Sequence, residues 1–193
     1  MEIKDLKNKK LCAVCGKNTP TEILYKQNFK LKDINENIFS ARRLPDGIHY
    51  RILKCLNCGL VFSSPILPEA TLKRLYKESK VTYWEQISDL TKTYGIYLKE
   101  LEKHEVKKGR FLEIGCGNGF LLTEAKKQGY REVYGVEPSR EAIKKTPKKI
   151  RKNIKSNLFK NGLFPKNFFD VICIFQTFDH VSDPNKFLKS CLE

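Results

Sequence analysis

Four cysteines in two identical short motifs are the residues with the clearest capacity for chemistry. Cys12 and Cys15 form one C-x-x-C-G motif, and Cys55 and Cys58 form the other. Two residues between thiolates allow one tight turn to direct both sulfurs at one ion, and the following glycine takes the positive φ that closes the turn. Four thiolates complete a tetrahedral shell and leave no position for water. The pattern therefore predicts a structural Zn²⁺ site, whereas redox dithiols or metal-free cysteines are the alternatives.

A glycine-rich turn between a predicted strand and a predicted helix is a second candidate site. Residues 111–114 are strand-like, and Gly115, Gly117 and Gly119 follow at alternate positions. Glycines let the backbone pass close to a ligand, and the N-terminus of the following helix presents free N–H groups. The dinucleotide fingerprint G-x-G-x-x-G/A requires glycine or alanine where Phe120 stands. The loop therefore favours a nucleoside ligand other than NAD.

A glutamate follows the next predicted strand. Glu137 comes directly after the run 132–136. A carboxylate at this place can accept hydrogen bonds from both hydroxyls of a ribose. A glycine loop is a weak signal on its own, and a glutamate at a strand end is otherwise often a helix cap. Because the two features occur in this order, they predict a nucleoside site.

The elements that must position these residues alternate between strand and helix. We predict strands over 111–114, 132–136 and 170–175, a weaker strand within 150–158, and helices over 120–127, after the N-cap Ser139 and from Pro184 after the N-cap Asp183. This alternation is typical of an α/β fold with a parallel sheet and crossover helices. Three or four strands are fewer than a doubly wound sheet usually has, so we expect the first part of such a domain or a reduced one.

The chain before residue 108 has a different pattern. The part that contains the cysteines has Gly and Pro turns and short strand-like runs at 49–53 and 60–62. Apolar side chains such as Leu72 and Leu75 then recur at helical spacing. We therefore expect three parts: a small zinc-ribbon domain over 1–66, a helical connector over 67–107 and a sheet domain over 108–193.

These motifs together resemble those of class I S-adenosylmethionine (SAM)-dependent methyltransferases. Residues 112–119 (Leu-Glu-Ile-Gly-Cys-Gly-Asn-Gly) and 136–139 (Val-Glu-Pro-Ser) resemble the first two motifs of that family. Residues 168–175 resemble its fourth strand, and residues 178–184 resemble its L-E-H-V-x-D-P segment, with Phe and Asp replacing Leu and Glu. Residues 50–62 are similar to a subgroup with an N-terminal zinc ribbon. The resemblance implies an incomplete Rossmann-like sheet and an enzyme that transfers methyl groups.

The resemblance also implies which residues contact SAM. An acidic residue and the glycine loop would hold the methionine end, and the residues after the second strand would hold the ribose. The residues after the third strand would lie near the adenine, and the residue after the fourth strand would face the methionine moiety or the methyl group. In the same order, these residues are Glu113 with Gly115, Cys116, Gly117 and Gly119, then Glu137 and Pro138, then Asn157 and Leu158, and finally Gln176.

His180 is the candidate general base. Methyl transfer from a sulfonium is an in-line displacement, in which the protein mainly aligns the nucleophile, the methyl group and the sulfur. A base is needed only when the acceptor is protonated, as a sugar hydroxyl is. His180 follows a predicted central strand at the edge where such sites form, and Asp179 is a second polar group beside it. Alternatively, His180 only hydrogen-bonds the backbone at the start of a helix.

Composition limits the remaining function classes. The chain of 193 residues has 40% hydrophobic and 31% charged residues, a globular balance that argues against disorder. No apolar run is long enough to span a bilayer, and the first ten residues lack the apolar core of a secretory signal. We therefore expect a cytoplasmic protein without a membrane partner, in which the seven cysteines serve metal binding more than disulfides.

The net charge of +15 raises the question of an anionic partner. Residues 140–160 carry nine basic residues and one acid, Glu141. Such a run is usually a solvated face. Lysine outnumbers arginine in the chain, whereas phosphate recognition favours arginine. A nucleic acid partner is therefore an alternative and not the first prediction.

Three functions are compatible with the sequence. The first is a SAM-dependent methyltransferase acting on a small molecule, with a sugar or a nucleotide-linked sugar as candidates. The second is an RNA methyltransferase that grips phosphates with the ribbon and the basic surface, which would make RNA binding steeply salt-dependent. The third is a non-catalytic zinc-binding interaction module or an inactive fragment. The sequence leaves the acceptor, the methylated atom and the oligomeric state open.

Overall fold

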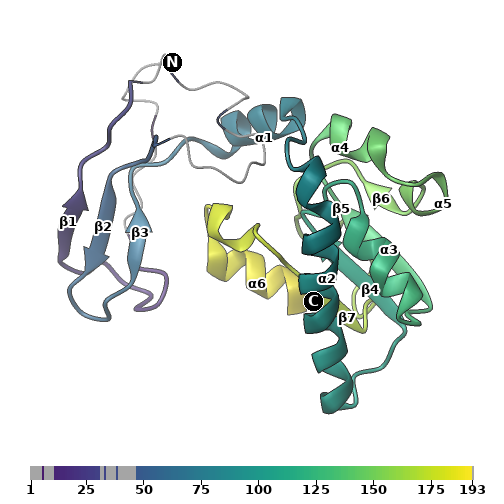
Figure 1. The fold of residues 1–193 in the computed structure, drawn as a ribbon. Coiled ribbons are helices and arrows are strands. Elements are labelled where there is room, and N and C mark those ends of the chain that lie inside the picture. The colour runs from purple at the N-terminus through teal and green to yellow at the C-terminus, as the bar shows by residue number, and fades with distance from the viewer. Residues whose placement is uncertain (1–5, 7–10, 31–32, 34–37, 39–46, 193) are drawn as a thin grey trace.

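The chain forms two sheets that helices connect (Figure 1). A computed structural model describes residue 6, residues 11–30, residues 33 and 38, and residues 47–192. Within this part, the first sheet has three antiparallel strands and the second has four parallel strands. The first helix of the chain lies between the two sheets in Figure 1.

The antiparallel sheet carries one of the cysteine motifs at a strand end. Its order is β1-β2-β3, with bounds Thr21–Tyr25, Ile52–Cys55 and Val61–Ser63. The strand-like runs expected at 49–53 and 60–62 correspond to β2 and β3, shifted by up to three residues. β1 was not predicted from the sequence, and every residue in it is exposed. The turn between β2 and β3 contains the second C-x-x-C-G motif.

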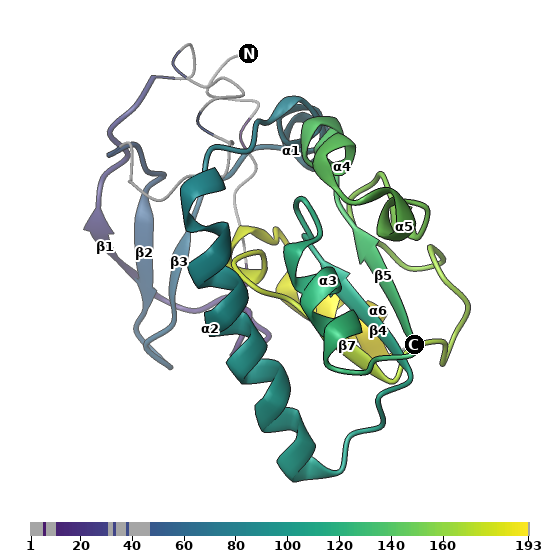
Figure 2. The ribbon, with the colours of Figure 1, turned by 45° about the vertical axis from the view of Figure 1, so that its right-hand side comes forward.

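The helical prediction for residues 67–107 is confirmed, with a break around residues 79–83. The elements are α1 Glu69–Glu78, the 3₁₀-helix η3 Trp84–Gln86, α2 Ile87–Glu100 and the 3₁₀-helix η4 Leu101–His104. Leu72 and Leu75 of α1 are buried against Leu6 and Leu67. α2 runs beside α3, which follows the glycine loop (Figure 2). The connector is therefore packed against both parts of the chain.

The parallel sheet confirms the predicted α/β class. Its order is β6-β5-β4-β7, and every neighbouring pair is parallel. The strands are β4 Arg110–Ile114, β5 Glu132–Val136, β6 Ile154–Lys155 and β7 Val171–Cys173. The helices are α3 Phe120–Lys127, α4 Arg140–Lys145, α5 Lys148–Arg151, the 3₁₀-helix η5 Phe178–His180 and α6 Pro184–Leu192. Because β4 lies between β5 and β7, the loops after these three strands meet at one edge of the sheet.

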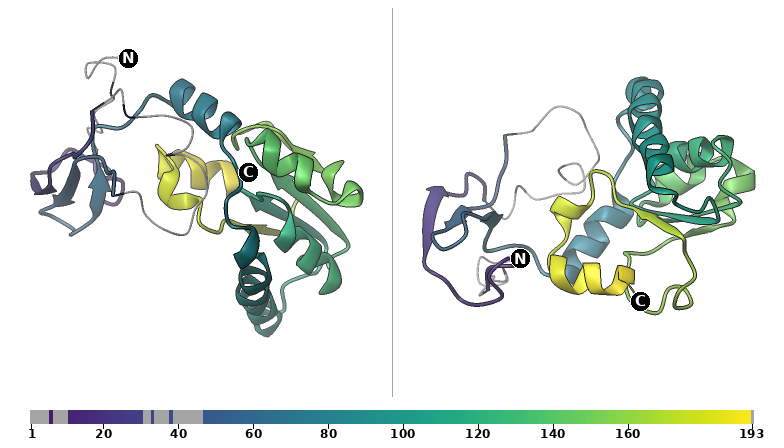
Figure 3. Two further views of the ribbon diagram at one scale, coloured as in Figure 1. Left: turned by 45° about the horizontal axis from the view of Figure 1, so that its top comes forward. Right: turned by 90° about the horizontal axis from the view of Figure 1, so that it is seen from below.

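Apolar side chains cover both faces of the parallel sheet. On one face, Leu98 of α2 and Leu121 of α3 pack with Phe111 of β4. On the other face, Phe187 of α6 packs with the core around Leu112. The view from below in Figure 3 shows α6 on the opposite side of the sheet from α2. Burial on both faces fixes the ends of the strands and so positions the loops that follow them.

Local signals set the ends of the helices as the sequence predicts. The Ser139 hydroxyl accepts a hydrogen bond from the Ala142 N–H at 3.3 Å, and Asp183 accepts one from the Lys186 N–H at 3.0 Å. Pro147 separates α4 from α5, because proline cannot continue the hydrogen bonds of the first helix. In the part of the chain that the structure describes, no helix has the length and apolar character to cross a membrane.

Candidate functional site

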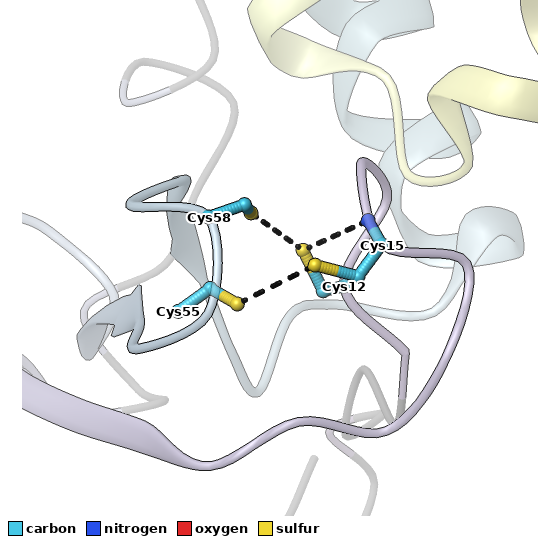
Figure 4. Close-up of side chains that lie close together, drawn as sticks. All are labelled: Cys12, Cys15, Cys55 and Cys58. Carbon is cyan, nitrogen blue, oxygen red and sulfur yellow. Dashed lines mark hydrogen bonds between the residues drawn. The ribbon is translucent and has the colours of Figure 1, made fainter.

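The four predicted metal-binding cysteines lie together (Figure 4). Their sulfur atoms all lie within 4.8 Å of one another. Sγ of Cys12 is 3.5 Å from Sγ of Cys58, and Sγ of Cys15 is 3.9 Å from Sγ of Cys55. Four sulfurs bound tetrahedrally at about 2.3 Å from zinc stand about 3.8 Å apart. The soft sulfur donors and their spacing therefore fit Zn²⁺.

The two cysteine turns have the same backbone geometry. The Gly16 N–H donates to the Cys12 carbonyl at 2.9 Å, and the Gly59 N–H donates to the Cys55 carbonyl at 2.9 Å. Gly16 and Gly59 have φ values of 67° and 78°. The positive φ expected of the glycine after each pair is confirmed, so the sequence requirement at these positions is conformational.

The surroundings of Cys55 favour the thiolate form that binds metals. The Thr19 hydroxyl lies 3.0 Å from its sulfur. This hydrogen bond, with those from the backbone of Cys58 and Asn57, lowers the pKa of the Cys55 thiol to about 6. All seven cysteines are free of disulfides. The cluster is therefore available to a metal ion.

The glycine loop begins at the carboxyl end of β4, beside the end of β5. The N–H groups of Gly115 and Cys116 donate to the carbonyl of Val136, the last residue of β5, at 2.8 and 3.2 Å. Gly115, Gly117 and Gly119 have φ values of 78°, 52° and 72°. Glycine adopts this left-handed conformation readily, whereas other residues rarely do. The structure thus brings the loop to the residues that follow β5, as the sequence predicts.

Each glycine of the loop makes room for a side chain from another segment. A Cβ atom on any of the three would collide with that side chain. The pairs are Gly115 with Thr177, Gly117 with the hydroxyl of Tyr83, and Gly119 with Thr146. The three neighbours come from the loop after β7, the segment before η3 and the end of α4. The glycines therefore allow three distant segments to converge on the loop.

Glu137 binds the glycine loop to the segment after β5. Its Oε2 accepts a hydrogen bond from the Gly117 N–H at 2.8 Å, and its Oε1 accepts one from the Ser139 N–H at 2.7 Å. Burial raises the pKa of the Glu137 carboxyl, and the two hydrogen bonds partly offset this effect. Glu137 therefore stabilises the shape of the loop, and its contact with a ribose stays a prediction.

Glu113 is a buried carboxyl with one oxygen that lacks a partner. The residue lies in β4 and is 3% exposed. Its Oε2 atom has no hydrogen-bond partner among the described residues, and the same is true of Oδ1 of Asn118 and Oε1 of Gln86. Burial, and then the charge of Glu137, raise the pKa of Glu113 well above its usual value. Buried polar atoms without a partner often indicate a ligand or water.

These features fit the nucleoside cofactor that the motifs imply. The unpartnered atoms of Glu113 and Asn118, before and within the loop, are oxygens, which accept hydrogen bonds, and the methionine end of SAM carries an ammonium group that donates them. Glycines at alternate positions leave the loop backbone without Cβ atoms there. A cavity of about 110 Å³ lies elsewhere, between the 159–169 loop and α6, and its lining includes no residue of the glycine loop.

The predicted base His180 and the predicted cofactor contact Gln176 lie on the exposed segment after β7. His180 belongs to η5, and its side chain is 55% exposed. Its Nε2 lies 3.5 Å from Oδ2 of Asp179, and its ring meets the Tyr76 ring edge to face at 6.2 Å. Gln176 is exposed and has a φ of 49°, a strained conformation that concentrates at functional sites.

The predicted adenine contacts lie beside Glu137. β6 neighbours β5, and the Glu137 N–H donates to the Lys155 carbonyl at 3.1 Å. Asn157 and Leu158 follow β6, and Oδ1 of Asn157 accepts a hydrogen bond from the Leu158 N–H at 3.0 Å. Asn157, Leu158 and Pro138 are all half-buried. The structure brings the predicted ribose and adenine positions to adjacent strand ends, and their contacts with a ligand stay predictions.

The sequence interpretation missed Tyr83, Gln86, Thr146 and Thr177. No motif marks these residues, and the first two lie in a segment interpreted only as a helical connector. Thr177 lies next to Gln176, which was predicted as a cofactor contact. Its position after β7 was therefore the one signal that could have indicated Thr177. Their place at the site depends on contacts between segments far apart in the sequence.

Comparisons with known proteins give one family match and several similar solved structures. Residues 83–193 match a family model described as a methyltransferase domain. One similar solved structure is a SAM-dependent methyltransferase from Aquifex aeolicus, with 26% identity, a TM-score of 0.42, and coverage of 56% of this chain and 64% of that chain. Another is the plantazolicin methyltransferase BpumL in complex with SAH, with 23% identity, a TM-score of 0.44, and coverage of 56% and 43%. The chain therefore spans less than two thirds of either structure. No curated protein matches it.

Proposed function

Because the chain belongs to the methyltransferase domain family, we propose that it binds SAM over the glycine loop and transfers the methyl group to an acceptor. The observation that carries this proposal is Glu113. Its carboxyl is buried next to the loop and has an oxygen without a partner. A buried carboxylate without a partner is costly, and a cationic ligand would compensate that cost. SAM carries positive charge on both its ammonium group and its sulfur.

The chain's own residues would bind and orient the cofactor. When bound, the cofactor supplies an electrophilic methyl group on a positively charged sulfur. Glu113 would accept hydrogen bonds from the ammonium group, and Glu137 would accept them from the ribose hydroxyls. Asn157 with Leu158 would border the adenine, and Gln176 would face the methyl group. The order of the strand ends, β7-β4-β5-β6, across the edge of the sheet supports these roles, which the family resemblance implies.

The acceptor in this proposal is a small molecule with a hydroxyl group, and a sugar or a nucleotide-linked sugar is the candidate class. The support is His180, which is exposed at the carboxyl end of β7. Oδ2 of Asp179 lies 3.5 Å from Nε2 of His180, and the Tyr76 ring packs edge to face against the imidazole. The imidazole would take the proton of the acceptor hydroxyl as the oxygen attacks the methyl group.

RNA is the second candidate acceptor, and the surface of α4 and α5 favours it. Lys144, Lys148, Lys149 and Lys152 are exposed there. However, Nε of Arg151 donates to the Thr146 carbonyl at 3.1 Å, so this guanidinium is used within the fold. Arg140 at the start of α4 is exposed, but a surface made mostly of lysines offers charge with few forked hydrogen bonds to phosphate. We therefore rank RNA below a small molecule.

The domain division that we propose keeps residues 1–66 as a zinc-ribbon domain, 67–107 as the connector and 108–193 as the cofactor-binding part. The zinc would have a structural role, because four thiolates leave no open coordination position. Nδ2 of Asn185 donates to the Ala13 carbonyl at 2.7 Å, which joins the first cysteine turn to α6. The zinc ribbon would therefore lie at one edge of the region where the methyl acceptor binds.

A methyl-transfer assay on the zinc-loaded chain tests the proposal. SAM would be offered with sugars, nucleotide-linked sugars or RNA, and formation of the demethylated product SAH would be measured by mass spectrometry. We expect turnover with a sugar class, reduced about 100-fold or more in His180→Ala, as loss of a general base predicts. His104→Ala, on exposed η4, is the control. Turnover with RNA alone would refute the acceptor class, and full turnover of His180→Ala would refute the base.

A further inference from the structure

Tyr83 contacts the glycine loop, although it lies before the motifs of the sheet domain in the sequence. It precedes η3, in the break between α1 and α2, and its side chain is half-buried. Its hydroxyl occupies the space where a Cβ atom on Gly117 would stand. The phenol group is therefore placed at the centre of the loop.

The surroundings of Tyr83 keep its hydroxyl proton in place. Burial, and then the charges of Glu137 and Glu113, raise the pKa of Tyr83 above its usual value. The hydroxyl group therefore keeps its proton and can donate it to an acceptor. A neutral phenol that donates its proton forms its strongest hydrogen bond with an anionic acceptor such as a ligand carboxylate.

The same turn also contains a buried acceptor without a partner. Oε1 of Gln86 is buried without a partner among the described residues, and the Gln86 N–H is bonded to the Tyr83 carbonyl at 3.1 Å. Tyr83 and Gln86 therefore present one donor and one acceptor from a single 3₁₀ turn. An amino-acid group, with a carboxylate and an ammonium on one carbon, has the complementary pair.

We propose that Tyr83 binds the amino-acid end of the cofactor, donating its hydroxyl proton to the carboxylate, and that the turn Tyr83–Gln86 forms the outer wall of the site. This inference rests on the proposed function, because it assigns a contact within the SAM site. It adds a residue that lies outside the glycine and acidic motifs. It also assigns a role to the break between α1 and α2, because the break contains Tyr83, which contacts the loop.

The chain contains its own reporter for this wall. Trp84 is the single tryptophan, adjoins Tyr83, and is 40% exposed with Nζ of Lys145 4.1 Å from its ring centre. A ligand that contacts the Tyr83–Gln86 turn changes the surroundings of this indole. The fluorescence of Trp84 therefore reports on the wall itself, whereas calorimetry reports on binding at any place.

The test compares two ligands that differ only at the amino-acid end. SAH has this end, and 5′-methylthioadenosine keeps the adenosine and the sulfur without it. Each is titrated into the zinc-loaded chain and its Tyr83→Phe variant by calorimetry and by Trp84 fluorescence. We expect Tyr83→Phe to raise the Kd for SAH about 10- to 100-fold, the effect of one hydrogen bond to a charged group, and to leave the Kd for 5′-methylthioadenosine unchanged. Tyr97→Phe, an exposed tyrosine of α2, is the control with no expected effect.

The outcomes distinguish a failure of the Tyr83 contact from a failure of the proposed SAM site. An unchanged Kd for SAH in Tyr83→Phe would overturn the contact, and so would equal weakening of both ligands, which would indicate a general structural role. Retained binding of 5′-methylthioadenosine shows that the variant is folded. If the wild-type chain bound neither ligand, the proposed SAM site itself would fail, and the inference with it.

Discussion

Oε2 of Glu137 accepts a hydrogen bond of 2.8 Å from the N–H of Gly117, so a residue after β5 fixes the loop after β4. Its other oxygen accepts from the Ser139 N–H at 2.7 Å, where α4 begins. One buried carboxylate thus connects the loop after β4, the end of β5 and the start of α4. Because the same side chain is the predicted ribose contact, the shape of the loop and the binding of a ligand depend on one residue.

Removing this carboxylate should destabilise the protein. We expect Glu137→Ala to lower the free energy of unfolding by about 2–4 kcal/mol, since it leaves two buried N–H groups without acceptors. Glu132→Ala, a half-exposed glutamate at the start of the same strand, should cost within about 1 kcal/mol. Urea denaturation of the zinc-loaded variants measures both. Equal costs would show that the Glu137 hydrogen bonds do not stabilise the loop.

Tyr83 should prevent position 117 from carrying a side chain without a collision. Gly117 and Gly162 both have positive φ, but a Cβ on Gly162 would meet no atom within 4 Å. Gly162→Ala should therefore cost about 1 kcal/mol of backbone strain, and Gly117→Ala about 1–3 kcal/mol more from the collision. Adding Tyr83→Phe to Gly117→Ala should recover part of that excess. The same cost at both glycines, from urea denaturation, would contradict the contact.

The buried carboxyl of Glu113 should make stability depend on pH. Its pKa is raised in the folded state above the usual 4.5, so the folded state holds the proton more strongly than the unfolded state. The stability that this provides is complete below about pH 4.5 and is lost as the pH rises toward the folded pKa. The Gln side chain of Glu113→Gln does not titrate, so its stability relative to the wild type should increase from pH 4.5 upward.

Denaturation of the two proteins at matched pH values measures this difference. Loss of metal at low pH affects both proteins alike and cancels in the comparison. A stability difference that stays constant with pH would mean that Glu113 has an ordinary pKa in the folded state.

Zinc should hold the N-terminal sheet together. We expect one equivalent of zinc per chain, and chelation should unfold β1–β3 while the parallel sheet stays folded, because structural zinc sites contribute on the order of 10 kcal/mol to small domains. Cys58→Ser should lose the metal. Cys191→Ser, a cysteine of α6 outside the cluster, should keep it. Metal analysis with circular dichroism provides the test, and a metal-free chain with an unchanged spectrum would contradict it.

The sequence predicts the parallel part of the fold closely because its signals are local. α3 and β5 have the predicted bounds, since glycines and apolar runs mark their ends. β1 could not be predicted, because all of its side chains are exposed and no burial pattern selects a face. Tyr83 could not be assigned to the site either. Its contact with Gly117 joins segments more than 30 residues apart, which come together through the packing of α2 on α3 and the hydrogen bond from Ser139 to the Ser79 carbonyl.

The most direct test of the central claim is a calorimetric titration of SAH into the zinc-loaded chain and into Glu113→Gln. The unpartnered oxygen of Glu113 makes this substitution a probe of the ligand rather than of the loop. We predict one SAH per wild-type chain and a Kd at least about tenfold higher for the variant, as expected for a hydrogen bond to a charged group. A folded wild-type chain with zinc bound that takes up no SAH would contradict the account.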